Sequence, residues 1–291
     1  MSKPTGRQFY LNILSKGTLY MSRLTGKRVL ITGGSSGIGQ EIALAYAKKG
    51  AIVVFSYHQN TKGAEQTVAA IQALGEKAYA IKANMADKDS LQTLFQKTLS
   101  QLGGLDILVN NAGTLTRHPN FLDISPDDFE HIQAVYIRAP FILTQLAAIQ
   151  MQVQKTGGSI INISSRSSTI ITPGLAHYEC SKAALDALTR SSASALAPYN
   201  IRVNAIAPGL VATEINRAQR ENDYSAWEKR SAQIPLGKAG EPKDIATIAV
   251  LLASEKSSWM TGTIIPIDGG VGVISPFNVP PKPENLPLAK L

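Results

Sequence analysis

The chain has 291 residues, 44% of them hydrophobic, and no apolar run near the ~20 residues that span a bilayer, so we expect a soluble protein with one sizeable core. Its single cysteine, Cys180, excludes an intramolecular disulfide and any metal site built on several cysteines. The formal net charge of +8 falls mainly on the first 40 residues, and no basic patch with interleaved aromatics follows, which argues against nucleic-acid binding.

Short apolar segments alternate with amphipathic ones along most of the chain. Strands are predicted at 28–31, 51–56, 77–82, 105–110, 158–164, 201–207 and 263–267, and helices at 38–49, 61–74, 87–102, from 125 onward, at 178–196 and at 242–253. At the fourth helix Ser125 is the expected cap, Pro126 suits the first helical position and Asp128 completes a capping box. This alternation predicts a doubly wound α/β fold with a parallel sheet in a single domain.

A glycine-rich turn directly follows the first strand. It reads Thr32-Gly33-Gly34-Ser35-Ser36-Gly37-Ile38-Gly39 and leads into a helix. Strand, glycine turn and helix in this order are typical of the phosphate-binding entry of a dinucleotide fold. Glycines let the backbone approach a pyrophosphate, and the free N–H groups at the helix start attract its charge.

Other polar motifs also follow strand ends. They are Asn110–Gly113, Ser164/Ser165 and Pro208-Gly209. Because ligands of open α/β sheets bind outside the carboxyl ends of the strands, these motifs should converge with the glycine turn on one crevice.

Tyr178 and Lys182 lie four residues apart, thirteen residues after Ser165. On a helix this spacing places both side chains on one face, so the ammonium can lie beside the phenol. A nearby positive charge should lower the tyrosine pKa from about 10 and make the phenol a better proton donor and acceptor. Combined with the glycine turn, this pattern indicates hydride transfer between a nicotinamide cofactor and a carbonyl or alcohol.

Taken together, these motifs resemble the short-chain dehydrogenase/reductase family, of the single-domain kind. The resemblance runs from about Leu24 to Val271 and also includes Arg202-Val203-Asn204 and Asp268-Gly269-Gly270. Within the family the chain is most similar to glucose or polyol dehydrogenases and to 3-oxoacyl reductases. The resemblance implies a homo-oligomer, a dimer or tetramer, with no nucleic-acid or membrane partner. The enoyl-reductase branch fits poorly because it spaces its tyrosine and lysine more widely.

The resemblance also implies a role for individual residues. Ser165 hydrogen-bonds the reacting oxygen, Tyr178 passes the proton, and Lys182 holds the nicotinamide ribose, while no metal is expected. Thr213 matches the position that binds the carboxamide, and Asn204 and Asp268 tie backbone together. The expected cofactor-binding residues are Gly33, Ser35, Ser36, Gly37, Ile38, Gly39, His58, Asn84, Asn110, Ala112, Gly113, Tyr178, Lys182, Pro208, Gly209, Val211 and Thr213.

Two positions depart from the family pattern. Tyr136 occupies the place of an asparagine that helps to hold a water between the lysine and solvent, so the proton relay is in doubt. Asn84 replaces a common aspartate near the adenine, and its amide can still hydrogen-bond that ring. The Tyr136 departure leaves a second interpretation open, a nicotinamide-nucleotide-binding pseudoenzyme with a sensing or scaffolding role.

The end of the second strand decides the choice of cofactor. NAD-selective relatives place an acid there for the ribose diol, but residues 51–60 contain none. Neutral Ser56, His58 and Asn60, with Ser35 in the turn, can meet a 2′-phosphate, although no arginine is present. NADP is therefore favoured over NAD or dual use.

The rest of the chain bears on substrate and location. The catalytic domain is expected at 24–271, with a substrate lid at about 210–235 in which Arg217, Tyr224 and Trp227 face either the pocket or the lid's own helices. Arg166 and His177 are further pocket candidates. Residues 1–23 form an extension, either a tail of a cytoplasmic protein or a mitochondrial address, and 272–291 a C-terminal tail. The expected substrate is a small carbonyl or secondary alcohol, such as a sugar, polyol or keto compound.

Overall fold

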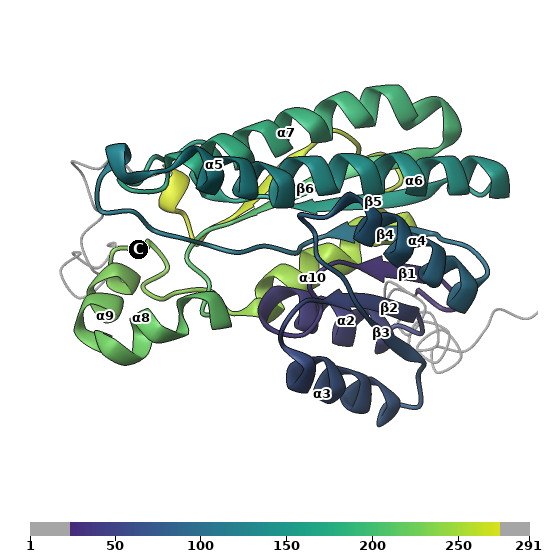
Figure 1. Ribbon diagram of the computed structural model, residues 1–291. Helices are drawn as coiled ribbons and strands as arrows, with labels where there is room; N and C mark the ends of the chain where they lie inside the picture. Colours follow the sequence, from purple (N-terminus) through teal and green to yellow (C-terminus); the bar gives the residue numbers. More distant parts are fainter. Residues whose placement is uncertain (1–23, 274–291) are drawn as a thin grey trace, which may run out of the picture.

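A seven-stranded parallel sheet forms the centre of the computed structural model, which describes residues 24–273. Its strand order is β3-β2-β1-β4-β5-β6-β7, and the chain reverses direction across the sheet between β1 and β4 (Figure 1). The strands span β1 Arg28–Ile31, β2 Ile52–Tyr57, β3 Ala78–Lys82, β4 Ile107–Asn110, β5 Gly158–Ile163, β6 Ile201–Pro208 and β7 Ile264–Ile267. This arrangement confirms the predicted doubly wound α/β class.

Both faces of the sheet are buried because successive strand residues point to opposite sides. Val29 and Ile31 of β1 lie in one hydrophobic cluster, while Leu30 between them lies in the other. Helices α2 Gly37–Ala47, α3 Thr61–Gln72 and α10 Pro242–Ala253 cover the first face. The second face is covered by α4 Lys88–Leu102, α5 Pro126–Gln133, α6 Ala139–Gln154 and α7 Ala176–Leu196. Figure 1 shows α5, α6 and α7 on one side of the sheet and α2, α3 and α10 on the other.

The helix starts follow local chemistry. Ser125 caps α5 by accepting the N–H of Asp128, and Pro126 occupies the first turn as predicted. Asn60 caps α3 in the same way through the N–H of Gly63. By contrast, Ser36 at the start of α2 makes no side-chain cap, so backbone N–H groups of that turn remain available.

A continuous helical run joins α5 to α6 through a π-helical turn at Ala134–Arg138. The run Pro126–Gln154 is long and apolar enough to cross a membrane by length and composition, but 56% of its apolar window is buried in the protein, as in a core helix. The π-turn contains Tyr136, one of the two positions that depart from the pattern of the family that the sequence resembles. Such turns inside α-helices occur often at functional sites.

The segment after β6 forms two short helices, α8 Arg217–Asn222 and α9 Tyr224–Ala232, within the range expected for the lid. Figure 1 shows this pair beside the main helical layers. Asp223 caps α9 through the N–H of Ala226, and Trp227 is buried beneath it. The predicted extension at 1–23 lies outside the described residues, as does the predicted tail at 272–291 except for residues 272 and 273.

Candidate active site

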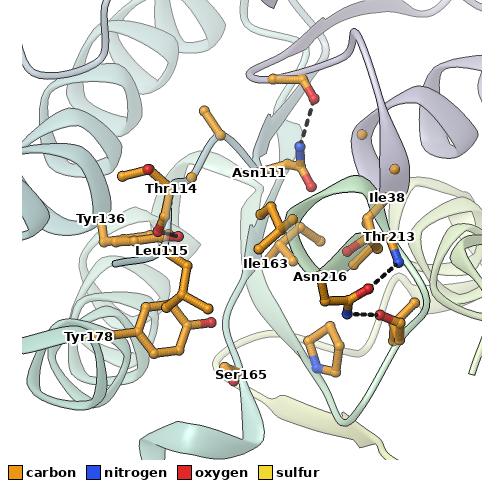
Figure 2. A pocket seen from close by; sticks show the side chains of 18 of the residues that line it. Ile38, Asn111, Thr114, Leu115, Tyr136, Ile163, Ser165, Tyr178, Thr213 and Asn216 are labelled. Atoms are coloured by element: carbon orange, nitrogen blue, oxygen red, sulfur yellow. Dashed lines mark hydrogen bonds between the residues drawn. The ribbon is translucent and has the colours of Figure 1, made fainter. Parts of the chain in front are cut away.

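A cleft of about 1260 Å³ opens at the carboxyl ends of the strands. Its walls come from the glycine turn after β1, the end of β2, the loops after β3 and β4, the residues after β5, helix α7, and the segment after β6. The predicted convergence of motifs on one crevice is therefore found in the structure. Figure 2 shows Tyr136, Tyr178 and Ser165 on one side of this cleft, with Ile38, Thr213 and Asn216 opposite.

The glycine turn is held rigidly against the neighbouring loop. Thr32 Oγ1 accepts hydrogen bonds of 2.9 Å from the N–H groups of both Asn111 and Ala112. Asn111 Nδ2 donates back to the carbonyls of Thr32 and Gly33. A Cβ at Gly39 would overlap the Gly33 carbonyl, so only glycine permits this close approach. The result is a fixed backbone cradle that opens toward the uncapped start of α2, which suits a pyrophosphate.

Residues at the end of β2 form the next part of the wall. Ser56, Tyr57 and His58 line the cleft; Ser56 is buried, and its Oγ accepts the N–H of Gly33 at 3.1 Å. Asn60 Nδ2 donates to the Ser35 carbonyl at 3.2 Å, which ties the turn to α3. Of the described residues that line the cleft, Glu214 alone is acidic, and it lies in the lid segment. The end of β2 therefore presents no carboxylate to a ribose phosphate.

Asn110 corrects one expectation, since it does not line the cleft. Its side chain is buried at the end of β4, where Nδ2 donates to Asn162 Oδ1 at 2.9 Å. Ala112 and Gly113 do line the cleft, as do the other expected cofactor residues. Asn111, rather than Asn110, hydrogen-bonds the glycine turn. The alternation of side chains along β4 places Asn110 in the interior.

Ser165, Tyr178 and Lys182 all line the cleft. Ser165 follows β5 and caps a short turn by accepting the N–H of Ser167 at 3.1 Å. Burial raises the pKa of the Tyr178 phenol, and the nearby Ser165 hydroxyl acts in the opposite direction. This pKa is therefore raised rather than lowered as predicted, because burial disfavours the charged phenolate more than Ser165 favours it.

Lys182 is buried and holds its position through the backbone. Its Nζ donates to the carbonyl of Ile163 at 2.7 Å and lies 5.6 Å from the centre of the Tyr178 ring. Burial lowers the lysine pKa to about 7, although the charge of Asp186 acts against this shift. Asp186, one helical turn further on, also accepts a 2.5 Å hydrogen bond from Ser164. Sequence reasoning missed Asp186, although its four-residue spacing from Lys182 is a usable signal.

Tyr136 packs directly on the catalytic pair. Its ring lies 4.0 Å from Lys182 Nζ and forms an edge-to-face contact with Tyr178, with ring centres 5.3 Å apart. The phenol donates a 2.6 Å hydrogen bond to the Thr114 carbonyl, and burial raises its pKa well above the ordinary value. A Cβ at Gly113 would overlap this hydroxyl. The chain therefore accommodates Tyr136 through a glycine in the facing loop.

Three other residues take positions that the sequence left open. Arg166 lines the cleft, and its Nε forms a 2.9 Å ion pair with Asp268. His177 is buried behind the cleft, where burial lowers its pKa, and packs edge-to-face on His118. Cys180 is exposed and does not line the cleft.

Asp268 and Asn204 link backbone segments through their side chains, as expected. Asp268 accepts the N–H groups of Gly270 and Gly272. Asn204 donates to the Met260 carbonyl and accepts the N–H of Thr263.

The lid side chains that line the cleft are not the three considered from the sequence. Arg217, Tyr224 and Trp227 do not line the cleft; Trp227 packs inside the lid, with the Arg220 guanidinium 5.7 Å from its ring centre. Arg230, Gln233 and Ile234 line the cleft together with residues 213–216. Arg117 and His131 also line it, and sequence reasoning missed them because nothing local distinguishes them from solvated residues. Residues 24–273 contain no group of three or more His, Cys, Asp or Glu placed to hold a metal.

A doubly wound sheet with a glycine cradle and a Ser–Tyr–Lys group in one cleft defines a nucleotide-binding α/β oxidoreductase. Comparison with known proteins agrees with this class. The family model described as enoyl-(acyl carrier protein) reductase matches residues 33–272. L-rhamnose 1-dehydrogenase (NAD(P)(+)) of Sphingomonas sp. (strain SKA58) is 38% identical over 87% of this chain and 99% of its own length. The 3-oxoacyl-acyl-carrier-protein reductase FabG of Staphylococcus aureus (strain Mu50) is 37% identical over 84% and 98%.

Solved structures agree with the sequence relatives. A short-chain type dehydrogenase/reductase from Mycobacterium marinum has a TM-score of 0.81 and 37% identity, covering 87% of this chain and 98% of that one. Acetoin dehydrogenase from Enterobacter cloacae has a TM-score of 0.80 and 34% identity, covering 88% and 99%. The chain belongs to the short-chain dehydrogenase/reductase family, and it is an oxidoreductase that acts on CH–OH or carbonyl groups.

Proposed function

We propose that this protein interconverts a small carbonyl compound and a secondary alcohol, using NADP(H) or NAD(H), with Tyr178 as the general acid/base. The observation that carries the proposal is the placement of Ser165, Tyr178 and Lys182 in the cleft that begins at the glycine cradle. The cradle, the uncapped start of α2 and the acid-free end of β2 fit a dinucleotide. When bound, the nicotinamide supplies or accepts the hydride.

The protein's own residues supply the proton and the orientation. Ser165 and Tyr178 line the same cleft, and the Ser165 hydroxyl is near enough to influence the Tyr178 phenol, so both hydroxyls can meet one substrate oxygen. In reduction the Tyr178 hydroxyl donates its proton to that oxygen, and in oxidation the phenolate takes it back. Lys182 is held by the Ile163 carbonyl beside Tyr178, where its charged form stabilises the phenolate. Its pKa of about 7 allows it to change charge near neutrality.

Preference for NADP rests on charge at the end of β2. Tyr57, His58 and Asn60 line the cleft there, and no acid accompanies them among the described residues. A carboxylate at this end would repel a 2′-phosphate, so its absence supports NADP. The name of the rhamnose dehydrogenase relative includes both cofactors. Values of kcat/KM for NADPH and NADH with one substrate test the preference.

The relatives suggest the range of substrates to test: a sugar, a 3-oxoacyl thioester and acetoin. We expect a homo-oligomer, a dimer or tetramer; exposed Phe141, Ile149 and Val153 on α6 support association. Light scattering after size exclusion tests the oligomeric state.

One experiment separates the enzyme from the alternative of a nucleotide-binding pseudoenzyme, which Tyr136 motivates. Nicotinamide fluorescence is titrated first, and turnover is then measured with L-rhamnose, polyols, acetoin and an acetoacetyl thioester. Cofactor binding with turnover of at least one substrate is expected. Tight binding with no turnover across an extended carbonyl and polyol panel would favour the pseudoenzyme.

A further inference from the structure

The cleft is lined by positively charged side chains that no acidic residue within 24–273 neutralises. Arg117 and Arg230 line it, and the side chain of neither forms an ion pair or hydrogen bond with any residue between 24 and 273. Arg166 differs, since its guanidinium is paired with Asp268. The acid on the cleft wall, Glu214, is bonded at 3.0 Å to Arg217 outside the cleft. Two arginines therefore line this space without an acidic partner in the part of the chain that the structure describes.

Arg117 belongs to a loop that is fixed on both sides of it. Upstream, the Thr114 carbonyl accepts the 2.6 Å hydrogen bond from Tyr136. Downstream, the N–H of His118 donates to the Gly174 carbonyl at 3.2 Å, and the His118 ring packs on His177, next to Tyr178 in sequence. The backbone of Arg117 is thus positioned on the Tyr178 side of the cleft, while its guanidinium remains unbonded.

Arg230 reaches the same region from the lid. It lies three residues after the buried Trp227 on α9, so the two side chains share the face that packs inward. The Arg230 guanidinium is half-buried, and burial together with the nearby charge of Arg117 lowers its pKa. Two arginine side chains that line one cleft, with no acid bonded to either among residues 24–273, favour an anion between them.

We propose that Arg117 and Arg230 bind an anionic group of the substrate, a carboxylate or a phosphate, while its carbonyl or hydroxyl group meets Ser165 and Tyr178. The guanidinium fork matches both anions through paired N–H donors. This inference rests on the proposed function and narrows it to small keto or hydroxy compounds that carry a negative charge. Since α9 belongs to the lid, such a substrate bridges the lid and the loop after β4.

The test compares substrates that differ by one charge. The pairs are acetoacetate with methyl acetoacetate, and dihydroxyacetone phosphate with dihydroxyacetone, each reduced with NADPH by the wild-type protein. The variants are Arg117→Gln, Arg230→Gln and the double variant. Lys229→Gln is the matched control, because Lys229 is exposed on the same helix and does not line the cleft.

The wild type should prefer the charged member of at least one pair by about tenfold or more in kcat/KM, and the double variant should lose that preference. Which pair shows the preference distinguishes a carboxylate from a phosphate. Lys229→Gln should keep it, and the KM for NADPH should remain unchanged in all variants. Equal use of charged and neutral substrates would overturn the proposal and leave the proposed function standing. A rise in the KM for NADPH instead would assign the arginines to the cofactor phosphates.

A binding measurement keeps the proposal testable if none of these compounds is turned over. Malonate and glycerol 3-phosphate are titrated calorimetrically into the wild-type and double-variant proteins saturated with NADP. Binding of either anion to the wild type, weakened at least tenfold in the double variant, is the expected result. Equal binding, or none, would overturn the anion site. Failure of the proposed function shows differently: anions bind as expected, yet no carbonyl or alcohol reacts.

Discussion

Tyr136→Phe removes one hydrogen bond at the centre of the site and preserves the ring. The lost bond joins the Tyr136 phenol to the Thr114 carbonyl over 2.6 Å, in a region where Tyr136 is 4% exposed. Leaving a buried acceptor unpaired costs about 1–3 kcal/mol. The ring still covers Lys182, so we expect turnover to change little while the free energy of unfolding falls by that amount.

Tyr136→Asn removes the ring as well. The loss of the contact between the ring and Lys182 Nζ, 4.0 Å from the ring centre, adds about 0.5–2 kcal/mol, and the cavity left behind raises the total cost to roughly 3–5 kcal/mol. The smaller amide also leaves room for water beside Lys182. If such a water connects the lysine to solvent, turnover should rise modestly, or stay unchanged where another relay exists, with little effect on cofactor affinity.

Urea unfolding and steady-state rates across pH, measured for the wild type and both variants, check this account. Tyr136→Phe should lower stability without changing turnover, and Tyr136→Asn should lower stability further while activity survives. If Tyr136→Asn abolishes activity in a folded protein, the reasoning is refuted, and Tyr136 is then a second phenol that donates to the substrate or to the relay.

Three further predictions concern other parts of the site. The buried Lys182 has a pKa of about 7 in the folded protein, against 10.5 when unfolded. The cofactor-free protein should therefore gain stability as pH rises from about 7 toward 10.5, by up to about 1.4 kcal/mol per pH unit. Lys182→Met should flatten this rise when the free energy of unfolding is measured in urea across pH. Tyr57→Asp should lower kcat/KM for NADPH about tenfold or more relative to NADH, and equal losses for both would contradict our interpretation of this strand end. Gly113→Ala should destabilise the protein by about 1–3 kcal/mol through overlap with the Tyr136 hydroxyl and the adjoining ring carbons. Tyr136→Phe removes the hydroxyl and should relieve part of that cost in a double-mutant cycle; additive effects would show that the hydroxyl contributes nothing to the overlap.

Local patterns were sufficient to predict most of the fold. The runs around Val29, Val53 and Ile107 become strands buried on both faces, because continuous β-branched sequences suit a covered parallel sheet. The helix start at Ser125 also follows from cap chemistry that acts within four residues. The π-turn at Ala134–Arg138 was not predicted, because it depends on how Tyr136 packs against distant residues.

The site was predictable to the extent that its residues belong to ordered motifs. The glycine turn, Ser165, Tyr178 and Lys182 meet in one cleft as their positions after strand ends imply. Asn110 was misplaced because side-chain direction at a strand end decides between cleft and core. Arg117 and Arg230 belong to a loop and a lid with no local signature, and their placement in one cleft depends on the tertiary fold. The direction of the Tyr178 pKa shift could not be predicted, because the four-residue spacing to Lys182 does not tell how deeply the phenol is buried.

Proton transfer by Tyr178 is the central claim, and Tyr178→Phe tests it most directly. This change removes the acidic hydroxyl but keeps the ring that packs on Tyr136. Turnover of a substrate found in the panel should fall at least ~10²-fold, while nicotinamide fluorescence still reports cofactor binding within a few-fold of the wild type. Normal turnover by a folded, cofactor-binding Tyr178→Phe protein would contradict the account.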